Sequence, residues 1–161
     1  MKQILIVALI LSMLVLPAFA ACDDQDRFGD CKDCEVLKLY EKDPSTWTIV
    51  EDGAYGHMRY TPEATELNFV FKGFLLEPAT DYSLIVYSPD SWPGVSSIIL
   101  GTGTTDELGY VKIKNTIDTE TLEDVKVWLV LSSDIGTTGM TGWNPTEYLF
   151  ENNLITYTEI V

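Results

Sequence analysis

The chain has 161 residues, of which 46% are hydrophobic and 22% charged, with 25 acidic residues against 10 basic ones. The formal net charge of −15 at pH 7 repels the phosphates of nucleic acids and argues against DNA or RNA as a partner. The hydrophobic content excludes a disordered acidic chain, and the length fits one domain with an ordinary core.

The first residues have the layout of a secretory signal. Lys2 supplies a positive charge, an apolar run follows at 4–16, and Pro17 breaks the helix before a small-residue pattern that ends at Ala20. The apolar run is shorter than the roughly 20 residues that a membrane-spanning helix needs. We therefore expect residues 1–20 to be a cleaved signal peptide and the mature protein to be secreted or held at the cell surface.

An acidic segment at 21–35 holds all three cysteines. In one interpretation Cys22 is the acylated first residue of a lipoprotein, which suits the small residues before it, and Cys31 pairs with Cys34. In the other, cleavage follows Ala20, Cys22 pairs with Cys31 or Cys34, and one thiol is left over. Disulfides are typical of exported proteins, and the sequence leaves both alternatives open.

From residue 36 onward the dominant hydrophobic period is two, which is typical of half-buried strands. The predicted strands are 36–40, 47–50, 57–60, 67–71, 82–86, 97–102, 111–114, 125–131 and 154–160. Turns rich in Pro, Asp and Gly separate them, and only 119–124 and 144–150 leave room for a helical turn. The range 36–161 is therefore predicted to be one all-β domain, an antiparallel β-sandwich.

Two short motifs carry a resemblance. The segment 76–84, LEPATDYSL, resembles the L-x-P-x-T-x-Y turn of fibronectin-type and other immunoglobulin-like sandwiches, and 103–110 resembles the T-D-x-x-G hairpin of exported sandwich modules. The resemblance implies an immunoglobulin-like sandwich in which Tyr82 starts a strand and bonds back to the preceding turn. Two longer stretches are similar to uncharacterised small secreted proteins of archaeal genomes, namely MRYTPEATELNFVFKGF and VWLVLSSD…GWNPTEYLFENNLI. This resemblance implies no known activity.

The sequence offers little support for an enzyme. His57 is the only histidine, so a Ser-His-Asp group would depend on it and a zinc site would have too few ligands. The sequence contains neither a nucleophile elbow nor a phosphate-binding glycine loop. Carboxylate pairs for glycan hydrolysis stay open, because 25 acids make chance pairs abundant. We therefore expect no enzymatic activity.

Calcium is the one cofactor that the sequence suggests. Alternate loops of an antiparallel sheet lie at the same pole, which gathers the 77–81 turn, the 102–109 turn and the 132–145 loop. Calcium prefers such oxygen-rich loops, although polar loops are also polar because water surrounds them. The candidate metal ligands in these loops are Glu77, Asp81, Asp106, Glu107 and Asp134.

Two loop tryptophans are candidate ligand contacts. Trp92 stands in the 88–95 loop, and Trp143 in the 132–145 loop, which is long for a connection without secondary structure. An exposed tryptophan can stack on a sugar or anchor a protein, or it can fold back over the end of the sandwich. By strand alternation, the two are expected at opposite poles.

Two classes of function follow. The first is a non-enzymatic extracellular or cell-surface module, structural or binding, whose partner is an unknown protein or glycan and whose contact with a membrane is limited to a lipid anchor. The alternative is a carbohydrate-binding module or a small glycan-directed hydrolase. Self-assembly through a sheet edge is a third interpretation, with the run 154–161 as the candidate strand. The oligomeric state stays open.

Overall fold

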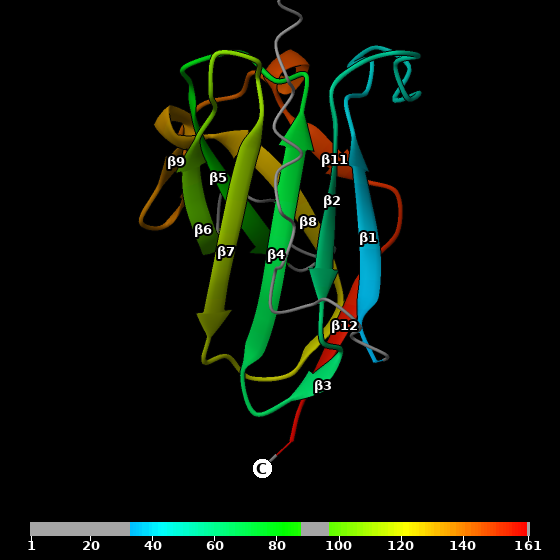
Figure 1. Cartoon of the computed structure of the whole chain (residues 1–161), viewed down its shortest axis with the longest axis vertical. Helices are drawn as coiled ribbons and strands as arrows, with labels where there is room; N and C mark the ends of the chain where they lie inside the picture. The colour runs from blue at the N-terminus through cyan, green and yellow to red at the C-terminus, as the bar shows by residue number, and fades with distance from the viewer. Residues whose placement is uncertain (1–32, 88–96, 161) are drawn as a thin grey trace, which may run out of the picture.

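The computed structural model describes residues 33–87 and 97–160, which form an all-β fold (Figure 1). Two 3-10 helices, η1 (Ser132–Asp134) and η2 (Pro145–Glu147), accompany the strands. The strands are β1 (Glu35–Tyr40), β2 (Tyr55–Tyr60), β3 (Glu63–Ala64), β4 (Leu67–Phe74), β5 (Asp81–Tyr87), β6 (Ile98–Thr104), β7 (Val111–Ile117), β8 (Leu122–Leu131), β9 (Ile135–Gly136), β10 (Gly139–Met140), β11 (Leu149–Glu151) and β12 (Ile155–Glu159).

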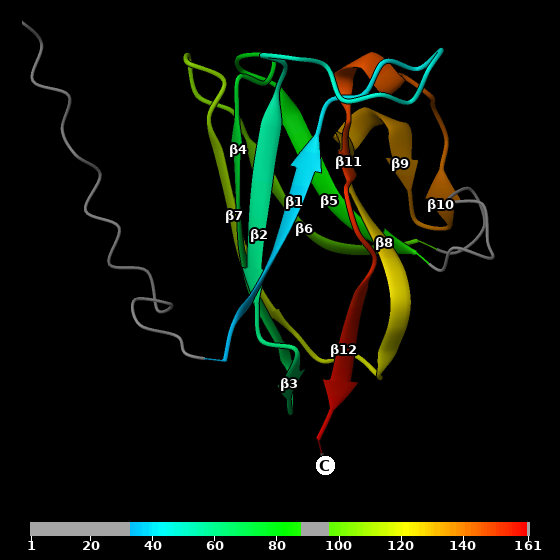
Figure 2. The same ribbon diagram turned by 90° about the vertical axis from the view of Figure 1, so that its right-hand side faces the viewer.

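Apart from the β9–β10 hairpin, these strands form one 10-stranded sheet that bends over on itself. From one end to the other the order is β7, β4, β2, β1, β11, β8, β5 and β6, with β12 beside the first half of β8 and β3 beside β12. All pairings except the parallel β3–β12 pair are antiparallel. The bend sets β1, β2, β4 and β7 across from β5, β6 and β8 (Figures 1 and 2), which is consistent with a β-sandwich.

The main core lies between the two halves of the bent sheet. Phe69 and Phe71 of β4 meet Leu84 of β5 and Val127 and Leu129 of β8 in one buried cluster. The period-two pattern of these strands is confirmed, since the core residues occupy alternate positions. Burial of each such side chain stabilises the fold by about 1.5–3 kcal/mol.

Two local predictions are wrong. The range 47–50 is no strand: a turn at 43–48 replaces it, with an isolated bridge between Lys42 and Ile49. The Asp43 side chain accepts hydrogen bonds from the backbone of Ser45, and such local bonds compete with strand pairing. The predicted helical turn at 119–124 is also wrong, because β8 begins at Leu122.

Several predictions fall outside the described residues, namely the signal peptide 1–20, Trp92, Cys22 and Cys31. Cys34 is disulfide-bonded, but its partner also lies outside the described residues, so the Cys31–Cys34 pairing stays a prediction. In the part of the chain that the structure describes, no helix has the length and apolarity to cross a membrane.

Candidate functional site

A second hydrophobic cluster lies on the outer face of β5, β8 and β11, away from the main core. An antiparallel sheet commonly leaves one face to water, but these strands are apolar on both faces, as in the run VWLVL of β8. The outer face therefore needs a cover. The buried members of the cluster are Ile85, Tyr87, Trp128, Val130, Tyr148 and Phe150.

The segment 132–148, in which the sequence predicts a long loop at 132–145, supplies part of this cover. It folds into η1, the β9–β10 hairpin and η2, and from it Ile135 and Met140 pack against the outer cluster. Figure 2 shows the hairpin beside β11 and β8. We refer to this segment as the flap.

Asp134 holds the flap together. Its side chain is only 7% exposed and accepts hydrogen bonds from the Tyr148 hydroxyl and from Asn144 Nδ2 at 2.7 Å. Its backbone oxygen accepts from the amides of Thr141 and Gly142. Burial, and then the hydrogen bond to Asp134, raise the pKa of Tyr148. The carboxylate predicted as a calcium ligand therefore has a structural task inside the flap.

Two tryptophans lie at the exposed edge of the outer cluster. Trp47 is 49% exposed and Trp143 42% exposed, and their ring centroids are 6.5 Å apart. Trp47 meets Phe150 edge-on at 5.2 Å, and Trp143 lies 5.8 Å from Trp128. With Tyr87, 4.9 Å from Trp128, these five rings form one aromatic cluster that we call the aromatic face, in which Tyr87, Trp128 and Phe150 are buried.

The turn at 43–48 holds Trp47 in a strained conformation. Trp47 has φ +57°, in the left-handed region that bulky residues avoid. Asp43 fixes the turn, because its Oδ1 accepts from the Ser45 amide at 2.7 Å and from Ser45 Oγ at 2.5 Å, while its backbone oxygen accepts from the Trp47 amide. These bonds from Ser45 lower the pKa of Asp43. Strain of this kind costs on the order of 1–3 kcal/mol and clusters at functional sites.

A carboxylate and two lysines border the aromatic face. Glu151 Oε2 is buried and has no hydrogen-bond partner in the described residues. Burial raises the pKa of Glu151, against the opposing effects of Lys42, Lys126 and a hydrogen bond from Trp128. The Lys126 ammonium lies 5.9 Å from the centre of the Tyr87 ring. The site thus combines flat apolar rings with groups that donate and accept hydrogen bonds.

The structure joins two of the turns that were predicted to share a pole. Thr105 Oγ1 donates to the backbone oxygen of Glu77 at 2.6 Å, and the Thr105 amide bonds to the backbone oxygen of Thr80. Asp81 Oδ1 accepts from Thr104 Oγ1 at 2.5 Å. The 77–81 and 104–110 turns are therefore held against each other, with the Glu77 and Asp81 side chains exposed.

The remaining predicted ligands of these turns are Asp106 and Glu107. Asp106 Oδ1 accepts from the amides of Leu108 and Tyr110, so it stabilises its own turn, and Glu107 is exposed. Within residues 33–87 and 97–160, no three acidic, histidine or cysteine side chains form a group that could hold a metal ion. The calcium site stays a prediction.

Sequence reasoning selected Trp143 but missed Trp47 and Trp128 as parts of the site. Trp47 was assigned to a strand, although the preceding DPST sequence is typical of a turn. The sequence around Trp128 does indicate that this residue is buried on the outer face, because an uninterrupted apolar run is typical of a strand that is buried on both faces.

Comparisons of the chain with protein-family models, with curated proteins and with solved structures find no match.

Proposed function

We propose that the chain is a non-enzymatic extracellular or cell-surface module with an immunoglobulin-like sandwich, and that it binds a ligand on the aromatic face. The secretory pattern of residues 1–20 supports export. The L-x-P-x-T-x-Y segment, together with the antiparallel all-β fold, supports the immunoglobulin-like assignment. The ligand-binding role has separate support.

The observation that carries the binding role is the pair of half-exposed tryptophans, Trp47 and Trp143, set over the buried rings of Trp128 and Phe150. Contiguous exposed apolar surface is typical of interaction sites, and tryptophan is enriched where binding energy concentrates. The strained backbone at Trp47 adds to this argument, because the fold maintains an unfavourable conformation there.

Between a protein and a glycan ligand, the polar groups at the border favour a glycan. Aromatic rings stack on the apolar faces of sugars, while the Lys126 ammonium beside the Tyr87 ring can donate hydrogen bonds at the edge of the face. Glycoside hydrolysis needs a second carboxylate at a defined distance from the first. Of the described residues at the border of the aromatic face, Glu151 supplies one such carboxylate, with a raised pKa. We therefore propose binding without hydrolysis.

A glycan array with the mature protein, residues 21–161, tests the proposal. Trp47→Ala and Trp143→Ala should each reduce glycan binding by about tenfold or more, since loss of a central aromatic costs at least 2 kcal/mol. Tyr55→Ala is the matched control, because Tyr55 is 42% exposed and stacks on Phe74, outside the aromatic face. Equal binding by all three variants, or no glycan bound at all, would count against the proposal.

A further inference from the structure

The outer face of β1, β2, β4 and β7 has a charge opposite to that of the chain as a whole. These strands lie side by side in front of β5, β6 and β8 in Figure 1, so their outer face is turned to the viewer. The outward positions are those that alternate with core residues such as Leu37 and Phe71. None of the outward positions in these four strands is Asp or Glu, and five are basic: Lys38, Arg59, Lys72, Lys112 and Lys114.

Three of these lysines and the single histidine form a row across the four strands. In the register of the sheet Lys38 pairs with His57, His57 with Lys72, and Lys72 with Lys112. We call these four residues the basic row, which spans about 14 Å because neighbouring strands lie about 4.8 Å apart. Like charges directly opposite each other destabilise a sheet. An anion that contacts both Lys72 and Lys112 would offset this repulsion.

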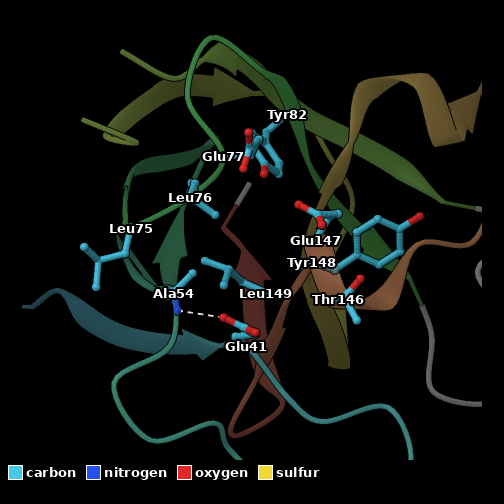
Figure 3. A pocket seen from close by; sticks show the side chains of 10 residues that line it. All are labelled: Glu41, Ala54, Leu75, Leu76, Glu77, Tyr82, Thr146, Glu147, Tyr148 and Leu149. Atoms are coloured by element: carbon cyan, nitrogen blue, oxygen red, sulfur yellow. Dashed lines mark hydrogen bonds between the residues drawn. The ribbon is translucent and has the colours of Figure 1, made fainter. Parts of the chain in front are cut away.

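The charges of the molecule are therefore segregated. The face holds five of the seven lysines and arginines of the described residues, and only Lys42 and Lys126 lie elsewhere. Acidic residues gather at other places, for example around the pocket that Glu41, Glu77 and Glu147 line at one end of the molecule (Figure 3). In a chain with a net charge of −15, a face without carboxylates favours a negatively charged ligand.

Exposed acids at both ends of the strands restrict the shape of that ligand. Glu51 and Asp52 precede β2 at one end, while Glu66 precedes β4 and Asp118 follows β7 at the other. A flat anionic surface such as a lipid bilayer would approach these carboxylates and be repelled by them. A narrow chain that lies along the basic row, across the strands, would not. The arrangement thus favours a linear polyanion.

A row of aromatic rings runs beside the basic row. Tyr55 and Phe74 are stacked with their centroids 5.1 Å apart, and Tyr110 lies 5.3 Å from Phe74. His57 of the basic row stacks on Phe74 at 5.8 Å, so the two rows are in contact. Aromatic rings offer a surface to the apolar faces of sugars. This row favours an acidic glycan over an acidic peptide.

We propose that the outer face of β1, β2, β4 and β7 binds a linear acidic glycan. Its carboxylates or sulfates contact the lysines of the basic row, and its sugar rings pack against Tyr55 and Phe74. The guanidinium of Arg59, two residues along β2 from His57, adds donors that suit a carboxylate. The site lies on the opposite side of the sandwich from the outer face of β5 and β8, and it does not rest on the proposed function of the aromatic face.

Calorimetric titration of the mature protein with hexagalacturonate tests the proposal. Its methyl ester is the matched probe, because it has the same sugar chain without the charges. Hexagalacturonate should bind saturably, more weakly as the salt concentration rises, and the ester should not bind. No binding of hexagalacturonate or of a heparin hexasaccharide, or equal binding of hexagalacturonate and its ester, would overturn the proposal. Tighter binding of the heparin hexasaccharide would identify sulfate rather than carboxylate as the preferred group.

Two double variants locate the binding. Lys72→Gln with Lys112→Gln should weaken hexagalacturonate binding about tenfold, since each removes one charge from the centre of the face. Lys42→Gln with Lys126→Gln makes the same change of net charge outside the face and should leave the affinity within about twofold. If both double variants weaken binding equally, the effect is general electrostatics and the proposal fails.

Two further probes test the other occupants of such a face. Polyglutamate of similar length has the charge without the sugar rings, and phosphatidylglycerol vesicles present the charge on a flat surface. Binding of either probe as tightly as hexagalacturonate would overturn the glycan as the ligand. Tyr55→Ala should weaken hexagalacturonate binding, and an unchanged affinity would favour an acidic peptide instead.

Neutral and acidic glycans distinguish this site from the aromatic face. Trp47→Ala with Trp143→Ala should leave the affinity for hexagalacturonate unchanged, whereas Tyr55→Ala should leave the binding of neutral glycans unchanged. Failure of one proposal is therefore separable from failure of the other. Loss of hexagalacturonate binding in the tryptophan variant would place the acidic glycan on the aromatic face and overturn the proposal.

Discussion

Two residues at the aromatic face adopt local arrangements that cost stability. Trp47 has a left-handed backbone, and Glu151 has a buried oxygen without a hydrogen bond in the described structure. Both lie next to rings of the aromatic face rather than in the main core. Features of this kind cost stability and are often found at functional sites.

The raised pKa of Glu151 makes a pH-dependent prediction. Above the ordinary pKa of 4.5 the folded protein holds the proton on Glu151 more tightly than the unfolded chain does. Stability therefore falls as pH rises through this range, because the buried carboxylate must ionise. Glu151→Gln should be more stable than the wild type at pH 7, and the difference should shrink toward pH 4.

Urea unfolding of the two proteins at pH 7 and pH 4 measures this effect. Glu120→Gln changes the same charge at an exposed position and should alter stability little at either pH. A Glu151→Gln protein that is less stable at pH 7 would show that the contacts with Lys42, Lys126 and Trp128 outweigh the cost of burial.

At the scale of elements, the sequence predicts those strands whose burial alternates. The patterns of β4 and β7 leave no ambiguity about the face that enters the core. The short strands β9, β10 and β11 have two or three residues each, too few to show a period. The fold of the flap depends instead on Asp134, whose partners Asn144 and Tyr148 lie ten and more residues away.

Loss of the Asp134 carboxylate should open the flap. Asp134→Ala leaves the Tyr148 hydroxyl without its acceptor and should destabilise the protein by about 1–3 kcal/mol. It should also expose the outer cluster, so tryptophan emission should shift to the red and a hydrophobic dye should bind. Thr137→Ala, at an exposed position of the same flap, is the control. Unchanged emission would mean that the apolar contacts of Ile135 and Met140 suffice to hold the flap.

At the scale of the whole molecule, the bend of the sheet decides which residues meet. It brings together Glu41, Glu77 and Glu147, which stand far apart in the sequence. No local pattern predicts that meeting, because it depends on the pairing of β1 with β11 and on how the loops pack at one end. Sequence reasoning therefore placed the 77–81 turn in a polar cluster but could not find the other two glutamates.

The bend also brings the two ends of the sheet, β6 and β7, against each other without a ladder of paired strands. A side-chain bond joins them, from Asn115 Nδ2 to the backbone oxygen of Leu100 at 2.9 Å. Close approach depends on glycine, because a Cβ on Gly101 would lie 2.7 Å from Cγ2 of the buried Ile113. A side chain at this position would require Ile113 or the backbone to shift.

Gly101→Ala should therefore separate the two edges and destabilise the fold by about 1–3 kcal/mol, the range for overpacking a core. Gly136→Ala is the matched control, since its added Cβ would meet only a Thr141 methyl at 3.1 Å and the Gly139 oxygen at 3.6 Å. Urea midpoints for the two variants measure the difference. If Gly101→Ala is as stable as the control, Ile113 can move aside, and the glycine is not what allows β6 to lie against β7. The edge would then owe its position to the Asn115 bond and to the core residues of both strands, among them Leu100 and Val111.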